Sequence, residues 1–211
     1  MKLKHLEVGE RGAGKSTLVL LHGYGAEERD LVPLAAELGE PLPVVSLQGP
    51  LSLGGRMRAW YHLEQTRDGG FRIDPAEVAA ADALVAEAVA ELAGQRGKLV
   101  LLGFSQGACM AVRAALAAPQ HVRALISLSG VPASVAPLQR APAEALRGLK
   151  VFAAHGVHDP LLPLQVGHAL RAELEDAGAD VTFHEYPMGH MVVPDELADL
   201  TAWLAKLPSV L

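Results

Sequence analysis

One serine of the 211-residue sequence has the surroundings of a catalytic nucleophile. Ser105 lies in Gly103-Phe104-Ser105-Gln106-Gly107, which follows the apolar run 99–102 and precedes a helix-compatible run of small and apolar residues. This strand, turn and helix pattern is typical of the nucleophile elbow, in which a sharp turn exposes the serine hydroxyl. Glycine is needed two residues before and after the serine because a Cβ atom there would clash with the neighbouring backbone. We therefore predict that Ser105 is a nucleophile.

A serine hydroxyl is a weak nucleophile at neutral pH, so it requires a histidine that accepts its proton and an acid that orients the histidine. Asp159 and His190 each follow a predicted strand, and the chain order serine, acid, histidine is the one that accompanies a nucleophile elbow. Asp180 and Asp195 are rival acids, but Asp180 begins a predicted strand and Asp195 caps a predicted helix. The predicted catalytic residues are therefore Ser105, Asp159 and His190.

Two backbone N–H groups are expected to stabilise the negative charge that forms when a serine attacks a carbonyl group. The turn His22-Gly23-Tyr24-Gly25 follows the predicted strand 18–21, at the carboxyl end where open parallel sheets bind ligands. In proteins with a nucleophile elbow, the loop after an early strand supplies one N–H group and the residue after the nucleophile supplies the other. We therefore predict an oxyanion hole formed by Tyr24 and Gln106, with Gly23 in contact with the substrate.

The stretch 51–73 shows no clear periodicity and contains two adjacent aromatic residues, Trp60 and Tyr61. A loop of this length in a compact domain is usually functional. We predict that it forms one wall of an acyl pocket, with Trp60 facing the substrate. A tryptophan packed in the core is the alternative interpretation.

Predicted strands alternate with predicted helices along nearly the whole chain. The strands are expected at 18–21, 43–47, 99–102, 124–128, 150–154 and 180–186. The helices are expected at 27–38, 74–94, 164–177 and 195–207, with one more after Ser105 that ends near Pro119. Such alternation indicates an α/β fold with a mostly parallel central sheet and helices on both faces. The length fits one domain, residues 1–211, without room for a large lid domain.

Residues 1–16 contain a second candidate motif. Gly9-Glu10-Arg11-Gly12-Ala13-Gly14-Lys15-Ser16 matches the phosphate-binding pattern G-x-x-x-x-G-K-[ST]. A P-loop must lie between a buried strand and a helix, because the first N–H groups of the helix hold the phosphates. Here residues 2–8 alternate like an edge strand, and a buried strand, 17–21, follows the motif. We therefore predict an N-terminal edge strand and a glycine-rich hairpin loop within 1–16, and a P-loop nucleotide-binding protein is the alternative.

Composition argues against several classes of partner and cofactor. The net charge is −6 at pH 7 and no basic patch is present, so we expect no nucleic-acid binding and no stable membrane association. No stretch has the ~20 apolar residues of a membrane span and the N-terminus lacks a signal-peptide core, so we expect a cytoplasmic protein. The single cysteine, Cys109, allows no internal disulfide, and His155, His158 and Asp159 lack the spacing of a helical metal motif. We predict no metal and no cofactor, and the sequence leaves a homodimer open.

Four motifs together resemble those of one family. They are Leu20-Leu21-His22-Gly23-Tyr24-Gly25, Gly103-Phe104-Ser105-Gln106-Gly107, His155-Gly156-x-x-Asp159 and Tyr186-Pro187-Met188-Gly189-His190. From about residue 17 to residue 205 the chain resembles the phospholipase/carboxylesterase family of α/β-hydrolases, which includes acyl-protein thioesterases. The resemblance implies an α/β-hydrolase fold, with Ser105 as nucleophile, Asp159 as orienting acid and His190 as base. Many members have an aspartate directly after the H-G-x-G turn, where this chain has Ala26.

The expected activity is that of a cofactor-free serine hydrolase that cleaves carboxylic esters of small or medium acyl chains through an acyl-enzyme. A thioesterase or lysophospholipase with the same triad stays open, because these activities differ in the shape of the pocket. A non-catalytic binding module on the same fold is a further alternative, and such a module would not be labelled at Ser105. The expected binding partner is a small-molecule ester or thioester.

Overall fold

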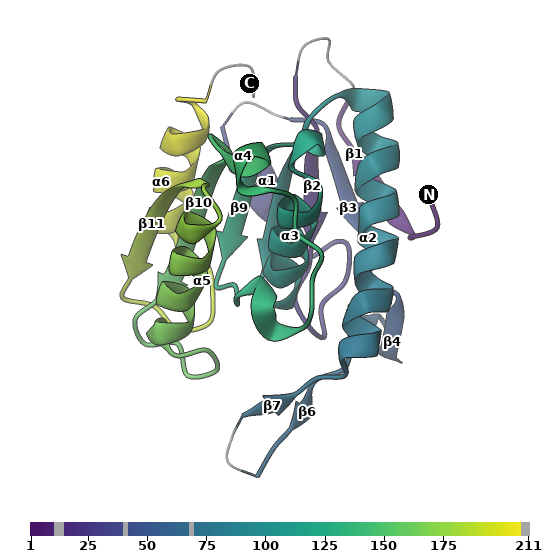
Figure 1. The fold of residues 1–211 in the computed structure, drawn as a ribbon, viewed down its shortest axis with the longest axis vertical. Coiled ribbons are helices and arrows are strands. Elements are labelled where there is room, and N and C mark those ends of the chain that lie inside the picture. Colours follow the sequence, from purple (N-terminus) through teal and green to yellow (C-terminus); the bar gives the residue numbers. More distant parts are fainter. Residues whose placement is uncertain (11–14, 40–41, 68–69, 208–211) are drawn as a thin grey trace.

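A seven-stranded sheet lies at the centre of the protein, whose computed structural model describes residues 1–10, 15–39, 42–67 and 70–207 (Figure 1). The strand order is β1-β3-β2-β8-β9-β10-β11, and every neighbouring pair is parallel except β1 and β3. The strands are β1 His5–Val8, β2 Leu18–Leu21, β3 Val44–Leu47, β8 Leu99–Phe104, β9 Val122–Leu128, β10 Lys150–Gly156 and β11 Asp180–Tyr186. The predicted mostly parallel sheet is confirmed.

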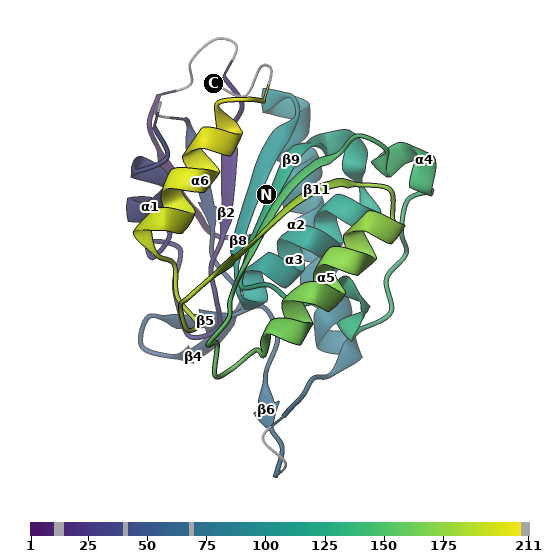
Figure 2. The same cartoon turned by 90° about the vertical axis from the view of Figure 1, so that its left-hand side faces the viewer.

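Helices cover both faces of this sheet (Figure 2). The helices α2 Pro75–Arg96, α3 Gln106–Ala117 and α5 Leu164–Asp176 pack on one face, and α1 Val32–Ala36 and α6 Pro194–Leu204 pack on the other. The short helix α4 Ala143–Leu146 and two 3-10 turns, Pro119–His121 and Ala133–Val135, lie in the connections. No helix in the described ranges is long and apolar enough to span a membrane.

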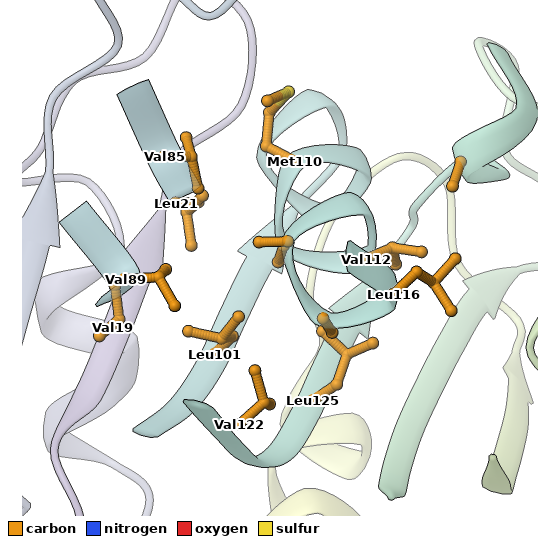
Figure 3. Packing of buried hydrophobic residues seen from close by; sticks show 14 of the residues in the cluster. Val19, Leu21, Val85, Val89, Leu101, Met110, Val112, Leu116, Val122 and Leu125 are labelled. Atoms are coloured by element: carbon orange, nitrogen blue, oxygen red, sulfur yellow. The ribbon is translucent and has the colours of Figure 1, made fainter. Parts of the chain in front are cut away.

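The two sides of each central strand belong to two separate hydrophobic clusters. Val19 and Leu21 of β2 pack with Val85 and Val89 of α2, as Figure 3 shows, whereas Leu18 belongs to the cluster under α1 and α6. Successive side chains of a strand point to opposite faces, so a strand covered on both sides must be apolar throughout. This burial explains why the central strands read as continuous apolar runs in the sequence.

Three predicted helices have wrong boundaries, and one of them, expected at 195–207, already ends at Leu204. The helix expected at 27–38 is only α1, Val32–Ala36, because Pro33 has no N–H group to donate and is tolerated only in the first turn. The helix expected to end at Gly94 continues to Arg96. The helix ends at Gly97, whose positive φ of 77° favours glycine, so Gly94 is an ordinary interior position.

The stretch 51–73 is not the single irregular loop that we expected. It contains two antiparallel hairpins, β4 Leu51–Gly54 with β5 Met57–Ala59, and β6 Glu64–Gln65 with β7 Phe71–Arg72. The β6–β7 hairpin projects from the same end of the molecule as the tip of β11 (Figure 1). These strands are too short to give a periodic signal in the sequence, which is why the prediction missed them.

The N-terminal strand is an edge strand, as predicted, but it does not form a hairpin with β2. β1 pairs with β3, which separates β1 from β2 in the sheet. Residues 11–14 of the P-loop-like motif lie outside the described residues, whereas Lys15 to Thr17 are not helical and lead directly into β2. The helix that a phosphate-binding loop requires therefore does not follow Ser16.

Candidate active site

Ser105 lies on a sharp turn between β8 and α3, and its backbone has the strained geometry of an elbow. Its φ of 54° is in the left-handed region, which is rare for residues other than glycine. A Cβ atom on Gly103 would lie 2.3 Å from the Gly107 carbonyl oxygen, and one on Gly107 would lie 2.0 Å from that of Leu21. Both glycines are therefore required for α3 to start directly against the ends of β8 and β2.

His190 lies between the serine and the aspartate that the sequence singled out. Its Nε2 atom is 2.8 Å from Ser105 Oγ, and its Nδ1 atom is 2.6 Å from Asp159 Oδ2. A carboxylate oxygen can only accept a hydrogen bond, so Nδ1 carries the proton of the neutral ring and donates a hydrogen bond to Asp159. The unprotonated Nε2 then accepts the hydrogen bond from the serine hydroxyl. The Phe104 ring packs against the imidazole with 5.0 Å between centroids. These contacts give His190 the position and the tautomer of a general base.

Asp159 is held in place by the turn that follows it. Its Oδ1 atom accepts hydrogen bonds from the backbone N–H groups of Leu161 and Leu162, both at 2.9 Å. Burial by itself would raise the pKa of Asp159, but the hydrogen bonds from Leu162, His190 and Leu161 outweigh it and lower the pKa below its usual value. The carboxylate is therefore charged at neutral pH, and one of its oxygens is free to orient the histidine.

The neighbouring histidine of the same turn supports this arrangement. His155, at the end of β10, is buried, and its Nε2–H donates to the Leu162 carbonyl at 2.8 Å. Its Nε2 atom is 3.8 Å from Asp159 Oδ2. These contacts give His155 a structural role in the turn. Among the residues of described position, no three His, Cys, Asp or Glu side chains gather as ligands of a metal ion.

Tyr24 and Gln106 are the residues whose N–H groups were predicted to form the oxyanion hole. Both residues line the pocket that contains Ser105 and His190. Gln106 is the first residue of α3, so its N–H group has no partner within the helix. The helix dipole places partial positive charge at the same point. Gly23, which was expected to contact substrate, lines the pocket too.

The pocket at Ser105 has a volume of about 770 Å³ and mostly apolar walls. The stretch 51–73 supplies one wall, with Tyr61, Leu63, Gln65, Phe71 and Ile73. The other walls are formed by Ala26, Phe104, Val131, Pro132, Val135, Leu161, Leu162 and Val166, beside the site residues already named. An apolar cavity with few polar groups around a serine hydroxyl suits the hydrocarbon part of a ligand.

Comparison with known proteins decides the family. The family model described as phospholipase/carboxylesterase matches residues 5–208. The chain belongs to the phospholipase/carboxylesterase family. It is 30% identical to an acyl-protein thioesterase 1 of Mycosarcoma maydis, over 97% of each chain.

Solved structures agree with this assignment. A Bacillus cereus carboxylesterase superposes with a TM-score of 0.82 at 26% identity, covering 98% of this chain and 95% of the other. A carboxylesterase from Mesorhizobium loti superposes with a TM-score of 0.76 at 26% identity, covering 93% and 90%. The predicted α/β-hydrolase fold is thereby confirmed.

Trp60 does not face the substrate, so this prediction is wrong. The side chain is 1% exposed and is absent from the walls of the pocket, whereas its neighbour Tyr61 lines them. The indole Nε1–H donates to the His22 carbonyl at 2.8 Å, and the His22 and Trp60 rings lie 5.4 Å apart. In this member of the phospholipase/carboxylesterase family, Trp60 is therefore a core residue beneath the site.

The side chain of Gln106 has a role that was not predicted from the sequence. Its Oε1 atom accepts from the Trp60 N–H at 2.9 Å, and its Nε2 donates to the Tyr61 carbonyl at 2.7 Å. The residue is 4% exposed. One signal in the sequence could have indicated this role. Gln106 is a polar residue at the start of a helix expected to be buried, and a buried amide must find hydrogen-bond partners.

Arg113 is the second residue that the sequence analysis missed. It is 1% exposed and donates two hydrogen bonds to Asp82 of α2, Nε to Oδ1 at 2.9 Å and the terminal nitrogen to Oδ2 at 2.6 Å. It also donates to the carbonyls of Ala133, Ala136 and Pro137. Because the segment 131–137 carries part of the pocket wall, this buried guanidinium supports the pocket from behind.

Proposed function

We propose that the protein is a serine hydrolase that cleaves carboxylic esters through an acyl-enzyme. The observation that carries the proposal is the hydrogen-bonded series from Ser105 Oγ through His190 to Asp159, with distances of 2.8 and 2.6 Å. Membership of the phospholipase/carboxylesterase family supports the same chemistry.

In the proposed acylation, Ser105 Oγ attacks the carbonyl carbon of the substrate and transfers its proton to His190 Nε2. The imidazolium that forms is stabilised by the charged Asp159. The carbonyl oxygen becomes an oxyanion, which would accept hydrogen bonds from the N–H groups of Tyr24 and Gln106. His190 then donates the proton to the leaving oxygen or sulfur, and the acyl group stays on Ser105.

In the proposed deacylation, a water molecule takes the place of the leaving group. His190 Nε2 accepts a proton from the water, whose oxygen attacks the acyl carbon. The same two N–H groups would stabilise the second oxyanion. When it collapses, the bond to Ser105 Oγ breaks, His190 returns the proton to the serine, and the carboxylic acid leaves. The steps require the chain's own residues and water.

Thioesters are a second candidate substrate class. The relative from Mycosarcoma maydis that is called acyl-protein thioesterase 1 aligns over nearly the whole chain, and this favours thioesters. The apolar walls around Ser105 suit an acyl chain in either class, since the acyl part of an ester and of a thioester is the same. A lysophospholipase activity would use the same triad.

The remaining parts of the proposal concern the setting of the enzyme. We take residues 1–211 as a single domain acting in the cytoplasm on small-molecule esters or thioesters, without nucleic acid and without stable membrane association. The net charge of −6 supports the absence of polyanionic partners. A homodimer stays a hypothesis, which the sedimentation velocity of the purified protein would decide.

The experiment that tests the function is hydrolysis of p-nitrophenyl esters from acetate to palmitate by wild type and Ser105→Ala. We expect turnover by the wild type with added chelator, and loss of nearly all of it in the variant, because the nucleophile is gone. Acyl-coenzyme A thioesters, measured in parallel, rank the two substrate classes by kcat/KM.

A well-folded wild type that hydrolyses neither class would overturn the proposal. Labelling with a fluorophosphonate then identifies the reason, since a reactive Ser105 would be modified and a non-catalytic binding module would not. Activity that survives in Ser105→Ala would equally contradict the assigned nucleophile.

A further inference from the structure

Trp60 is hydrogen-bonded at two points to the two sides of the proposed oxyanion hole. Its indole Nε1–H donates to the carbonyl of His22, two residues before Tyr24. Its backbone N–H donates to the side chain of Gln106. Tyr24 and Gln106 are the residues whose N–H groups we propose as oxyanion donors, so one buried tryptophan links the segments that carry both.

We infer that Trp60 is a positioning residue that fixes the two oxyanion donors relative to each other. The inference rests on the proposed function, because it assigns a role within that site. Tyr24 follows β2 and Gln106 begins α3, so the chain does not join the two donors directly. Hydrogen-bond donors must be held within about 0.5 Å of their productive positions to stabilise a transition state. The hydrogen bonds of Trp60 to both elements hold the two donors at such a fixed separation.

The His22 end of this link allows little movement. A Cβ atom on Gly107 would lie 2.4 Å from the His22 carbonyl oxygen, so this oxygen is packed against the first turn of α3 while it accepts from Trp60. The His22 ring is also fixed, since Nδ1 donates to the Gly23 carbonyl at 2.8 Å and Nε2 accepts from the Gly49 N–H at 2.9 Å. The backbone that leads into the Tyr24 turn is therefore held on several sides.

The ring of His22 is neutral in this position. Burial lowers the pKa of His22 more than its hydrogen bond to Gly23 and the neighbouring acids raise it. A neutral ring can donate from one nitrogen and accept at the other, as the two contacts require. The link between Trp60 and the turn therefore does not depend on a charged group.

The Gln106 end of the link is equally constrained. The carboxamide accepts from Trp60 N and donates to the Tyr61 carbonyl, so both of its polar atoms are used within one peptide segment. Rotation of this side chain would break both bonds and leave buried polar groups unpaired, which is costly. Because the side chain and the proposed donor N–H belong to the same residue, a shift of Trp60 is transmitted to the donor.

The test compares Trp60→Phe with Trp203→Phe, which replace the two tryptophans of the sequence. Phenylalanine keeps an aromatic ring but removes the indole N–H. Trp203 lies on α6 against Phe152, on the other face of the sheet, and is the matched control. Removing one whole oxyanion donor costs about 10²–10³ in kcat, so we expect a displaced donor in Trp60→Phe to lower kcat by about tenfold or more, with KM nearly unchanged.

Two further measurements separate positioning from loss of folded protein. Active-site titration gives kcat per reactive serine, which a partly unfolded sample would not lower. Phenylboronic acid forms a tetrahedral adduct with a reactive serine, and its inhibition constant should rise by about the same factor as kcat/KM falls, because its oxygen occupies the hole. Gln106→Met, which removes the other half of the link, should behave as Trp60→Phe does.

The possible failures are distinguishable. If wild type shows no serine-dependent turnover, the proposed function fails, and the inference fails with it. If wild type is active and Trp60→Phe keeps its kcat per titrated site and its boronic acid affinity, the inference alone is overturned. If Trp60→Phe and Gln106→Met both fail to fold, the link serves stability rather than the positioning of the hole, and the inference is overturned as well.

Discussion

Replacing Asp159 with asparagine should change which nitrogen of His190 carries the proton. In the wild type, Oδ1 accepts from the N–H groups of Leu161 and Leu162, and Oδ2 accepts from His190 Nδ1. The oxygen of an asparagine is its only acceptor, and the two N–H groups would keep it in the Oδ1 position. The NH₂ group would then face Nδ1, the ring proton would move to Nε2, and Nε2 could no longer accept from Ser105.

The expected loss is large because the wrong tautomer cannot act as a base. The corresponding change in a serine protease triad lowers kcat about 10⁴-fold, which is about 5.5 kcal/mol of transition-state stabilisation. We expect a loss of this order in Asp159→Asn, with KM for p-nitrophenyl butyrate nearly unchanged. Asp180→Asn and Asp195→Asn are matched controls, since these rival acids lie at the start of β11 and in the first turn of α6.

The assay is steady-state hydrolysis after active-site titration, with thermal melting of each variant to establish that it is folded. A folded Asp159→Asn variant that keeps kcat within about tenfold of the wild type would refute the assignment of the acid. An equally large loss of kcat in Asp180→Asn or Asp195→Asn would also refute the assignment of Asp159, because neither of these carboxylates contacts His190.

Three other perturbations test separate parts of the structure. Arg113→Met leaves the Asp82 carboxylate and the carbonyls of Ala133, Ala136 and Pro137 without their buried donor, so we expect the free energy of unfolding to fall by about 3–5 kcal/mol and Tm by roughly 6–20 °C. A Tm shift of a degree or two would contradict the role of the guanidinium. Phe71→Ser, in the pocket wall, should lower kcat/KM for long-chain esters more than for acetate esters. Met57 is 50% exposed and lies outside the pocket, so the control variant Met57→Ser should leave kcat/KM unchanged for both kinds of ester. Burial raises the pKa of Glu196 to about 7 from the usual 4.5, so the folded protein binds this proton more tightly than the unfolded chain does. The free energy of unfolding should therefore fall by about 3 kcal/mol as the pH rises from 4.5 to 7. Denaturant unfolding as a function of pH should show this slope in the wild type and not in Glu196→Gln.

The parts of the site that depend on local geometry could be predicted from the sequence. The glycines of the elbow are required by contacts within a few residues of Ser105 or with the strand next to it, so their spacing is visible in the chain. Asp159 and His190 follow strands that are apolar enough to recognise, and parallel strands bring their carboxyl ends to one edge. Their convergence follows from the order of elements alone.

The error at Trp60 has a simple geometric origin. Trp60 and Tyr61 lie in a bend directly after β5, and only Tyr61 lines the pocket. Both are aromatic and both are buried, hence nothing in the sequence indicated which one lines it. The decision comes from Gln106, whose two hydrogen bonds fix the orientation of this segment. That residue is far away in the chain, and a single sequence does not reveal such a contact.

Arg113 illustrates the same limit. The sequence shows an arginine within a helix of small and apolar residues, which indicates either an exposed position or a buried partner. Its partners are a carboxylate on α2 and carbonyls of the segment after β9, so they depend on how three elements pack. The helical periodicity of α3 carries no information about these neighbours.

The glycine of the His155-Gly156-x-x-Asp159 motif determines how His190 reaches the serine. β9 lies between β8 and β10, so the segment after β11 must pass over the end of β10 for His190 to approach Ser105. A Cβ atom on Gly156 would lie 2.4 Å from the carbonyl oxygens of both Met188 and Gly189. The His158 N–H donates to the Met188 carbonyl at 3.0 Å, so the two turns are joined at this crossing. A side chain at residue 156 would separate them, and the same displacement would lengthen the contact between His190 and Ser105. The sheet order thus requires a glycine at residue 156, since only glycine lets the turn that holds Asp159 and the turn that holds His190 lie in direct contact.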